Sequence, residues 1–177
     1  MKNTAYIAQS LDGFIAGPSG ELDWLETIDN PDHNDFGFSQ FMAGVDALLM
    51  GKNTFEKIAS FDHWPYDKPV FVLSSSLKAL DTRFTGKATL VSGTLEQVIT
   101  LLNRQGFKHL YIDGGRLIQS CLKAGIMDEL IITSVPYLLG EGIPLFTHLA
   151  SPVHLTLLKS EVLVNQLVKN HYKIVNA

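Results

Sequence analysis

The chain has 177 residues and is neither strongly charged nor strongly apolar. Hydrophobic residues make up 46% of it and charged residues 18%, with a formal net charge of -4 at pH 7. This balance excludes the basic surface of a nucleic-acid-binding protein. No apolar run approaches the ~20 residues of a membrane span, and the N-terminus lacks the pattern of a signal peptide. We therefore expect a cytoplasmic protein with one domain, residues 1–177, and a lone cysteine, Cys121, that packs in the core.

Strands and helices are expected to alternate through the first two thirds of the chain. The hydrophobic pattern predicts strands over residues 4–9, 45–50, 69–73, 88–91 and 110–112. It predicts helices over about 35–44, after Gly51, over 94–104 with Thr94 as N-cap, and from about 117 to 122. Parallel strands joined by crossover helices follow from this order.

Between the first strand and the first helix, a turn-rich loop contains a small apolar island, residues 14–16. An apolar island is unusual in a surface loop, so we interpret it as a flap that covers something.

Two predicted junctions between a strand and a helix contain glycine. The first has Gly51 and Lys52, followed by Asn53 or Thr54 as a helix cap, and the second has Gly114 and Gly115. A helix start offers free N–H groups and a favourable dipole to an anion, and glycine allows the anion to approach the backbone. Both junctions therefore favour a phosphate or pyrophosphate site, although each also fits a plain tight turn.

The sequence pattern in the last third of the chain predicts β-strands. It has a long apolar strand over residues 128–136, a broken loop, and two alternating segments over 153–164 and 166–175 joined by a predicted hairpin turn at 164–166. The fold class is α/β, with a mixed central sheet of about eight strands flanked by about four helices.

Five segments in this order carry a family resemblance: SLDGFIA at 10–16, MGKNTFE at 50–56, VLSSS at 72–76, IDGGRLIQSCL at 112–122 and DELIITSVPYLLGEGIPLF at 128–146. Together they resemble the dihydrofolate reductase-like family, and in particular the branch shared with the reductase domain of the bifunctional riboflavin biosynthesis deaminase–reductase. The resemblance implies a single dihydrofolate reductase-like domain that binds NADPH across its strand ends, and a homodimer, as in many relatives.

The resemblance also assigns residues to the cofactor. The set that matches comprises Ala8, Ile15, Ala16 and Gly17 around the nicotinamide, Gly51, Lys52, Asn53 and Thr54 at the first phosphate junction, Leu73, Ser74 and Ser75 at the ribose and its 2′-phosphate, and Gly114, Gly115, Arg116 and Leu117 at the second junction. Asp113 departs from the dihydrofolate reductases, which have a third glycine there. A carboxylate beside a pyrophosphate is unfavourable unless it points away or accepts N–H groups.

Reduction of a C=N or C=O bond also needs a proton source. The resemblance assigns this role to Asp35, with Thr133 orienting it. Burial against Phe38 and Phe41 is then expected to raise the pKa of Asp35. Asp35 is equally a natural helix N-cap. Asp12 is the alternative acid, although Asp-Gly is also a common turn pair.

The six histidines, His33, His63, His109, His148, His154 and His171, lack the short paired spacing of a metal site. Two hypotheses remain. The first is an NADPH-dependent reductase of a small heterocycle, which is either pterin- or folate-like or resembles a riboflavin-pathway pyrimidine. The second is a non-catalytic nucleotide-binding or dimeric interaction module that keeps the fold.

Overall fold

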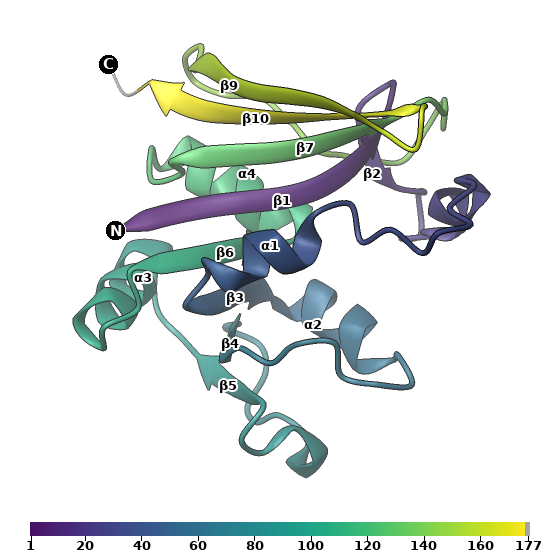
Figure 1. The fold of residues 1–177 in the computed structure, drawn as a ribbon. Helices are drawn as coiled ribbons and strands as arrows, with labels where there is room; N and C mark the ends of the chain where they lie inside the picture. Colours follow the sequence, from purple (N-terminus) through teal and green to yellow (C-terminus); the bar gives the residue numbers. More distant parts are fainter. Residues whose placement is uncertain (176–177) are drawn as a thin grey trace.

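A mixed sheet of eight strands forms the centre of the computed structural model, which describes residues 1–175 (Figure 1). The strands lie in the order β5-β4-β3-β6-β1-β7-β10-β9. Their bounds are β1 Lys2–Ser10, β3 Ala47–Gly51, β4 Val70–Leu73, β5 Ala88–Val91, β6 His109–Asp113, β7 Glu129–Val135, β9 His154–Leu163 and β10 Leu167–Val175. The first six in spatial order are parallel, so their carboxyl ends meet at one side of the sheet, which we term the carboxyl edge.

Two pairs of helices cover the sheet. The helices are α1 Phe38–Ala43, α2 Lys52–Ala59, α3 Leu95–Arg104 and α4 Gly115–Lys123. α1 and α2 pack on one face with Tyr6 and Tyr111 of the sheet, whereas α3 and α4 pack on the other with Ala5 and Ile112. Among the described residues no helix is long and apolar enough to cross a membrane. The predicted α/β fold, with its eight-stranded mixed sheet and four helices, is confirmed.

The helix starts differ in part from the prediction. α3 carries the expected capping box, in which Thr94 accepts the N–H of Gln97. The predicted caps Asn53 and Thr54 are wrong, because α2 begins directly after Gly51 and has no side-chain cap. α1 is also shorter than predicted, since Gly37 precedes it in the left-handed region with φ 85°.

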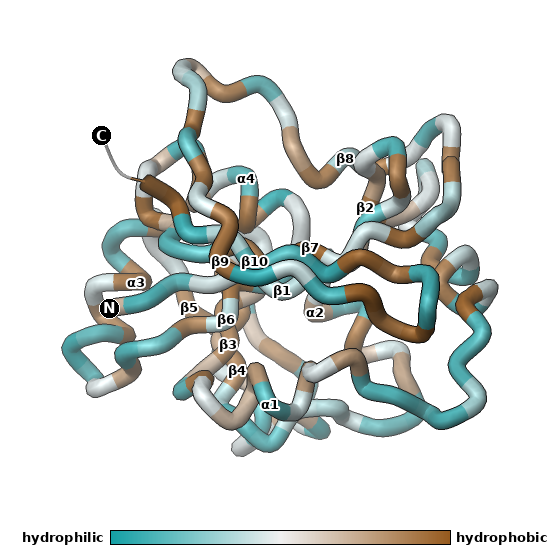
Figure 2. The backbone as a smooth tube through the Cα atoms, turned by 45° about the horizontal axis from the view of Figure 1, so that its top comes forward, coloured by the Kyte–Doolittle hydropathy of each residue, from teal (hydrophilic) through white to brown (hydrophobic). Residues whose placement is uncertain are grey.

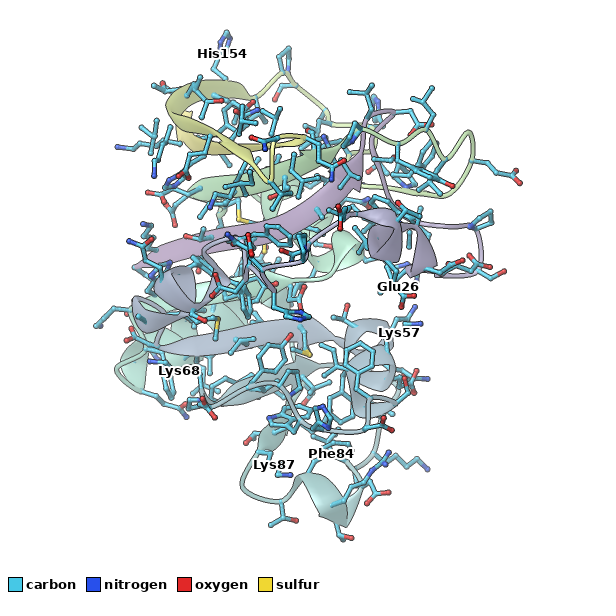
Figure 3. The ribbon with its side chains drawn as sticks, turned by 45° about the vertical axis from the view of Figure 1, so that its right-hand side comes forward. Glu26, Lys57, Lys68, Phe84, Lys87 and His154 are labelled. Carbon is cyan, nitrogen blue, oxygen red and sulfur yellow. The ribbon has the colours of Figure 1, made fainter. Side chains whose placement is uncertain are left out.

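The apolar island forms a strand, β2 (Phe14–Ala16), which the sequence did not predict. It pairs with β8 (Ile143–Pro144) in a separate two-stranded sheet. β2 and the residue before β8 are in close contact, because a Cβ on Gly142 would collide with the carbonyl oxygen of Ala16. The 3-10 helix η1 (Asp23–Thr27) follows this flap. At the carboxyl edge η1 stands opposite α2, with Glu26 and Lys57 on their facing sides (Figure 3).

The predicted hairpin is confirmed as β9 and β10. Its turn places Val164 and Asn165 at positive φ, 43° and 59°. β10 runs antiparallel to β7, and β9 is the edge strand. Apolar residues gather at the turn end of this hairpin (Figure 2).

Candidate functional site

The two glycine junctions lie side by side at the carboxyl edge. β3 and β6 are neighbours, with Met50 opposite Asp113, so α2 and α4 begin next to each other. The two junctions are in close contact, because a Cβ on Gly114 would collide with the side chain of Thr54. Gly114 also has φ 95°, which side-chain-bearing residues rarely adopt.

Neither of these helix starts is capped by a side chain. α3 contrasts with them, since its capping box satisfies its first N–H groups. The first N–H groups of α2 and α4, which no side chain caps, therefore lie next to each other at the carboxyl edge, where an anion such as a pyrophosphate is favoured. A Cβ on Gly51 would meet only open space, so the backbone there is accessible. These residues fit a dinucleotide.

The flap covers the start of α4. Gly115 is buried, and a Cβ added to it would collide with the tip of Ile15 in β2. Gly115 therefore faces the flap and not an open ligand path, which differs from the role that the sequence suggested for it. Ala16 and Gly17 are buried beside Ile15, and Arg116 is exposed on the first turn of α4.

Asp113 lies at the end of β6, next to the uncapped N–H groups. Removal from water raises the pKa of Asp113 to about 6, although Tyr111, the N–H of Gly114 and Tyr66 act in the opposite direction. The hydroxyl of Tyr66 donates to the Asp113 carboxylate over 3.4 Å. The carboxylate thus has hydrogen-bond donors of its own, as its position beside a pyrophosphate requires.

The side chains near the position assigned to the 2′-phosphate, which include Lys52 of the neighbouring junction, differ in how many of their polar atoms already have partners. Lys52 is 40% exposed and pairs with Glu56 at 3.6 Å, an interaction that is weak at a surface. Ser74 is committed to a turn, since its hydroxyl accepts the N–H groups of Ser76 and Leu77 at 3.2 and 3.1 Å. Ser75 is exposed. Lys52 and Ser75 are therefore the side chains available to an added phosphate.

Asp12 holds two loops together. Its carboxylate accepts the hydroxyl of Ser10 at 2.6 Å and the N–H groups of Leu139 and Gly140 at 3.2 and 2.8 Å. These bonds, with Ser10 foremost, lower the pKa of Asp12. The residue connects the β1–β2 turn to the loop after β7 as an ionised carboxylate, the form opposite to a proton donor.

Asp35 is exposed, and the expectation of a raised pKa is wrong. Its carboxylate accepts the N–H groups of Gly37 and Ser39 at 2.8 and 2.9 Å. Hydrogen bonds from Ser39 and Gly37 lower the pKa of Asp35. The carboxylate therefore supports the start of α1, although Gly37 is the N-cap residue. Among the described residues, no hydrogen bond joins Asp35 to Thr133.

Thr133 and Ala8 face each other across neighbouring strands. Ala8 of β1 pairs with Thr133 of β7, which in turn pairs with Lys169 of β10. Thr133 is 6% exposed. Sequence reasoning missed Lys169, and it also missed Tyr6, which the two-residue period of β1 places on the same face as Ala8. That period was the available signal for Tyr6.

A cavity of about 280 Å³ lies beside the flap. Its lining includes Gly17, Trp24, Tyr137 and Leu139. Trp24 and Leu139 also belong to an apolar cluster that contains Ala8. The cavity therefore borders the strand end to which the resemblance assigns the nicotinamide. Among the described residues, no group of three or more His, Cys, Asp or Glu side chains could hold a metal ion.

Solved structures share this arrangement. A protein from Shewanella sp. PV-4, provisionally assigned to riboflavin biosynthesis, is 46% identical and superposes with a TM-score of 0.96 over 99% of this chain and 100% of its own. The deaminase/5-amino-6-(5-phosphoribosylamino)uracil reductase of Thermotoga maritima is 14% identical, with a TM-score of 0.76 over 98% of this chain and 56% of its own. Dihydrofolate reductase from Enterococcus faecalis, complexed with NADP(H) and RAB-propyl, is 18% identical, with a TM-score of 0.68 over 99% of this chain and 97% of its own.

The sheet order, the paired helix starts and the flap define a dihydrofolate reductase-like α/β protein. The sequence profile of the RibD C-terminal domain matches residues 2–169. The chain belongs to this family, which is the reductase domain of a riboflavin-pathway enzyme.

Proposed function

We propose that the protein is an NADPH-dependent reductase that transfers a hydride to a small heterocyclic substrate, either pterin- or folate-like or similar to a riboflavin-pathway pyrimidine. The observation that carries the proposal is the pair of uncapped helix starts at Gly51 and Gly114. They offer N–H groups to a pyrophosphate from two sides, and the flap that carries Ile15 lies over one of them. NADPH supplies the hydride, and the chain supplies the binding site and its orientation.

The test is the loss of reduced-nicotinamide absorbance when the pure protein and NADPH are mixed with a panel of oxidised pterins and pyrimidines. Turnover of at least one heterocycle, with NADPH preferred over NADH, is the expected result. Tight binding of NADPH without turnover of any heterocycle would favour the second candidate below. Failure to bind NADPH would refute the reductase and leave the interaction module.

The second candidate is a non-catalytic nucleotide-binding or dimeric interaction module. One observation favours it, because both carboxylates considered as proton donors, Asp12 and Asp35, are committed to backbone N–H groups. If a heterocycle is turned over, the variants Asp12→Asn and Asp35→Asn test whether either acid takes part in the reaction. A reductase that uses either acid loses roughly 10²–10⁴-fold in rate on its substitution.

We also propose that the protein forms a homodimer through one face of the β9–β10 hairpin. The strand register places Leu155, Leu157 and Val162 on the same face, where they are 41%, 54% and 68% exposed. The total accessible surface is 10116 Å², whereas a monomer of 19.6 kDa typically exposes about 8,600 Å². The excess is about the area that one subunit buries in a large dimer interface.

A further inference from the structure

Two hydrogen-bond donors of the sheet converge on a single backbone carbonyl. The Tyr6 hydroxyl donates to the carbonyl oxygen of Phe36 over 2.8 Å, and the Lys169 ammonium donates to the same oxygen over 2.7 Å. The Lys169 side chain is only 13% exposed, and its other partner is Glu161 at 3.4 Å. Two donors, one of them charged, form a strong site for one oxygen with two lone pairs.

The donors lie beside the proposed nicotinamide position. Ala8, Thr133, Lys169 and Glu161 form one continuous row across β1, β7, β10 and β9. Tyr6 precedes Ala8 by two residues and so points to the same face of the sheet. The two donors therefore belong to the face of the sheet that carries Ala8 and Thr133, which the resemblance assigns to the nicotinamide and to the proton-donor region.

The segment that now occupies the donors is weakly attached. Residues 29–37 form no helix or strand. Among the hydrogen bonds of the described residues, those from Tyr6 and Lys169 are the only ones that join this segment to the central sheet. His33 and Phe36 have φ 48° and 57°, a region that costs non-glycine residues free energy. A ligand that supplies an oxygen in place of the Phe36 carbonyl and an apolar ring in place of the Phe36 side chain can therefore displace the segment.

The apolar part of the segment marks where a flat ring would lie. The Phe36 side chain packs against the cluster that contains Trp24, and Ala8 packs against the same cluster. Trp24 also lines the cavity beside the flap. A flat heterocycle bound here would thus take the place of the Phe36 ring, and its exocyclic oxo group would take the place of the Phe36 carbonyl oxygen.

We propose that Tyr6 and Lys169 form a subsite for the ring carbonyl oxygen of a flat oxo-heterocycle, and that the Phe36 carbonyl occupies this subsite until the ligand displaces it. This inference rests on the proposed function for the identity of the site, and it narrows the substrate class to rings that carry an oxo group. An amino group at that position is disfavoured, because Lys169 has no acceptor for its N–H groups and the Tyr6 hydroxyl alone can accept one of them. The same donors stabilise negative charge on the oxygen that they bind.

The test compares two pteridines that differ in these groups and in the ring N–H groups that accompany them, lumazine with oxo groups at positions 2 and 4, and 2,4-diaminopteridine. Each is titrated near neutral pH without NADPH, with tryptophan fluorescence as the readout. Wild-type protein is expected to bind lumazine more tightly by about tenfold or more, the effect of a hydrogen bond to a charged group. In Lys169→Met and Tyr6→Phe the preference falls toward parity.

The matched control is Lys159→Met. Lys159 pairs with the same Glu161 at 2.8 Å but is 63% exposed, so this variant keeps the wild-type preference. Hydrogen exchange gives a second readout. Amides of residues 29–37 exchange faster in Lys169→Met, and they do so in wild-type protein when lumazine is added.

Three results would overturn the subsite: equal binding of the two pteridines, binding of neither, or a preference for lumazine that survives in both Lys169→Met and Tyr6→Phe. Because the titration contains no cofactor, its outcome is independent of whether NADPH is bound or oxidised. A protein that prefers lumazine but ignores NADPH would refute the reductase and leave the subsite standing. A protein that oxidises NADPH but binds both pteridines equally would refute the subsite and leave the reductase standing.

Discussion

At the residue scale, we propose that Lys52 decides the choice of cofactor. It is the cation at the start of α2, and its partner Glu56 holds it only at 3.6 Å on the surface. A 2′-phosphate can therefore replace Glu56 at little cost. Lys52→Ala is expected to weaken NADPH by roughly 1–3 kcal/mol, the range for a hydrogen bond to a charged group, and NADH far less. Fluorescence titration with both cofactors measures the difference.

Lys123→Ala is the control for this variant, because Lys123 lies in the last turn of α4, at the opposite end from the uncapped N–H groups. It should leave both affinities unchanged. Equal losses for NADPH and NADH in Lys52→Ala would show that the lysine contacts the pyrophosphate that both cofactors share.

Asp113 is expected to give cofactor binding a pH dependence. Its pKa is about 6 because the carboxyl group is withdrawn from water. Below that pH the group is neutral, and above it a carboxylate lies beside the position proposed for the pyrophosphate. The affinity for NADPH is therefore expected to fall as the pH rises from 5.5 to 8, and Asp113→Asn should remove most of this change. Calorimetric titration across that range measures it, and an affinity that rises with pH in wild-type protein would contradict the account.

The contribution of Asp113 to the stability of the fold also falls as the pH rises. A carboxyl group whose folded-state pKa is raised binds its proton more tightly in the folded than in the unfolded chain. The contribution of Asp113 is full below its ordinary pKa and is lost as the pH rises through about 6. Glu129 shows the opposite direction, because its bonds to Lys2 and His171 lower its pKa despite burial, so its contribution is lost as the pH falls.

At the element scale, the flap and α4 are coupled through one contact. Gly115 has no room for a side chain, because Ile15 of β2 occupies that space. Gly115→Ala is therefore expected to push β2 away from α4 and to speed the hydrogen exchange of residues 13–17. The far end of Ile15 is the obstacle, so adding Ile15→Ala should return exchange toward the wild-type rate. This double-mutant cycle isolates the contact.

Gly51→Ala is the control for the flap, since its Cβ enters open space and touches no part of β2. If Gly115→Ala alone leaves the exchange of the flap unchanged, the contact between Ile15 and Gly115 does not hold β2 in place.

At the scale of the whole molecule, the exposed hairpin predicts the oligomeric state. Val162 is 68% exposed on the apolar face of β9, next to Val168 of β10. Val162→Glu is expected to convert the homodimer to a monomer, because it places a charge in an apolar interface. Light scattering coupled to size exclusion measures the mass. Thr156→Glu, on the opposite face of the same strand by register, should leave the dimer intact, and a monomeric wild-type protein would contradict the proposal.

The parts of the fold that local patterns determine could be predicted from the sequence. The glycine junctions at Gly51 and Gly114 and the capped helix after Thr94 follow from neighbouring residues, so they were predictable. β2 was not, because its three residues become a strand only by pairing with Ile143 and Pro144, more than 120 positions away. Strand pairing at that distance leaves no local signal.

The candidate site likewise has one part that local sequence patterns predict and another part that they do not. The helix starts are local, whereas the surroundings of a side chain are not. The wrong expectation for the pKa of Asp35 came from assuming burial against Phe38 and Phe41, which the position of the loop decides. Tyr6 and Lys169 were missed because three separate segments bring them to the Phe36 carbonyl. Sequence reasoning thus found the part of the site proposed for the cofactor more easily than the part proposed for the substrate.

The proposed function requires that the paired helix starts at the carboxyl edge hold the pyrophosphate of NADPH. The most direct measurement is the change in backbone amide chemical shifts when NADPH is added to the labelled protein. We predict the largest changes at residues 51–54 and 114–117, where uncapped N–H groups meet the anion. Saturable binding with the largest changes elsewhere, such as along β9 and β10, or no binding at all, would contradict the account.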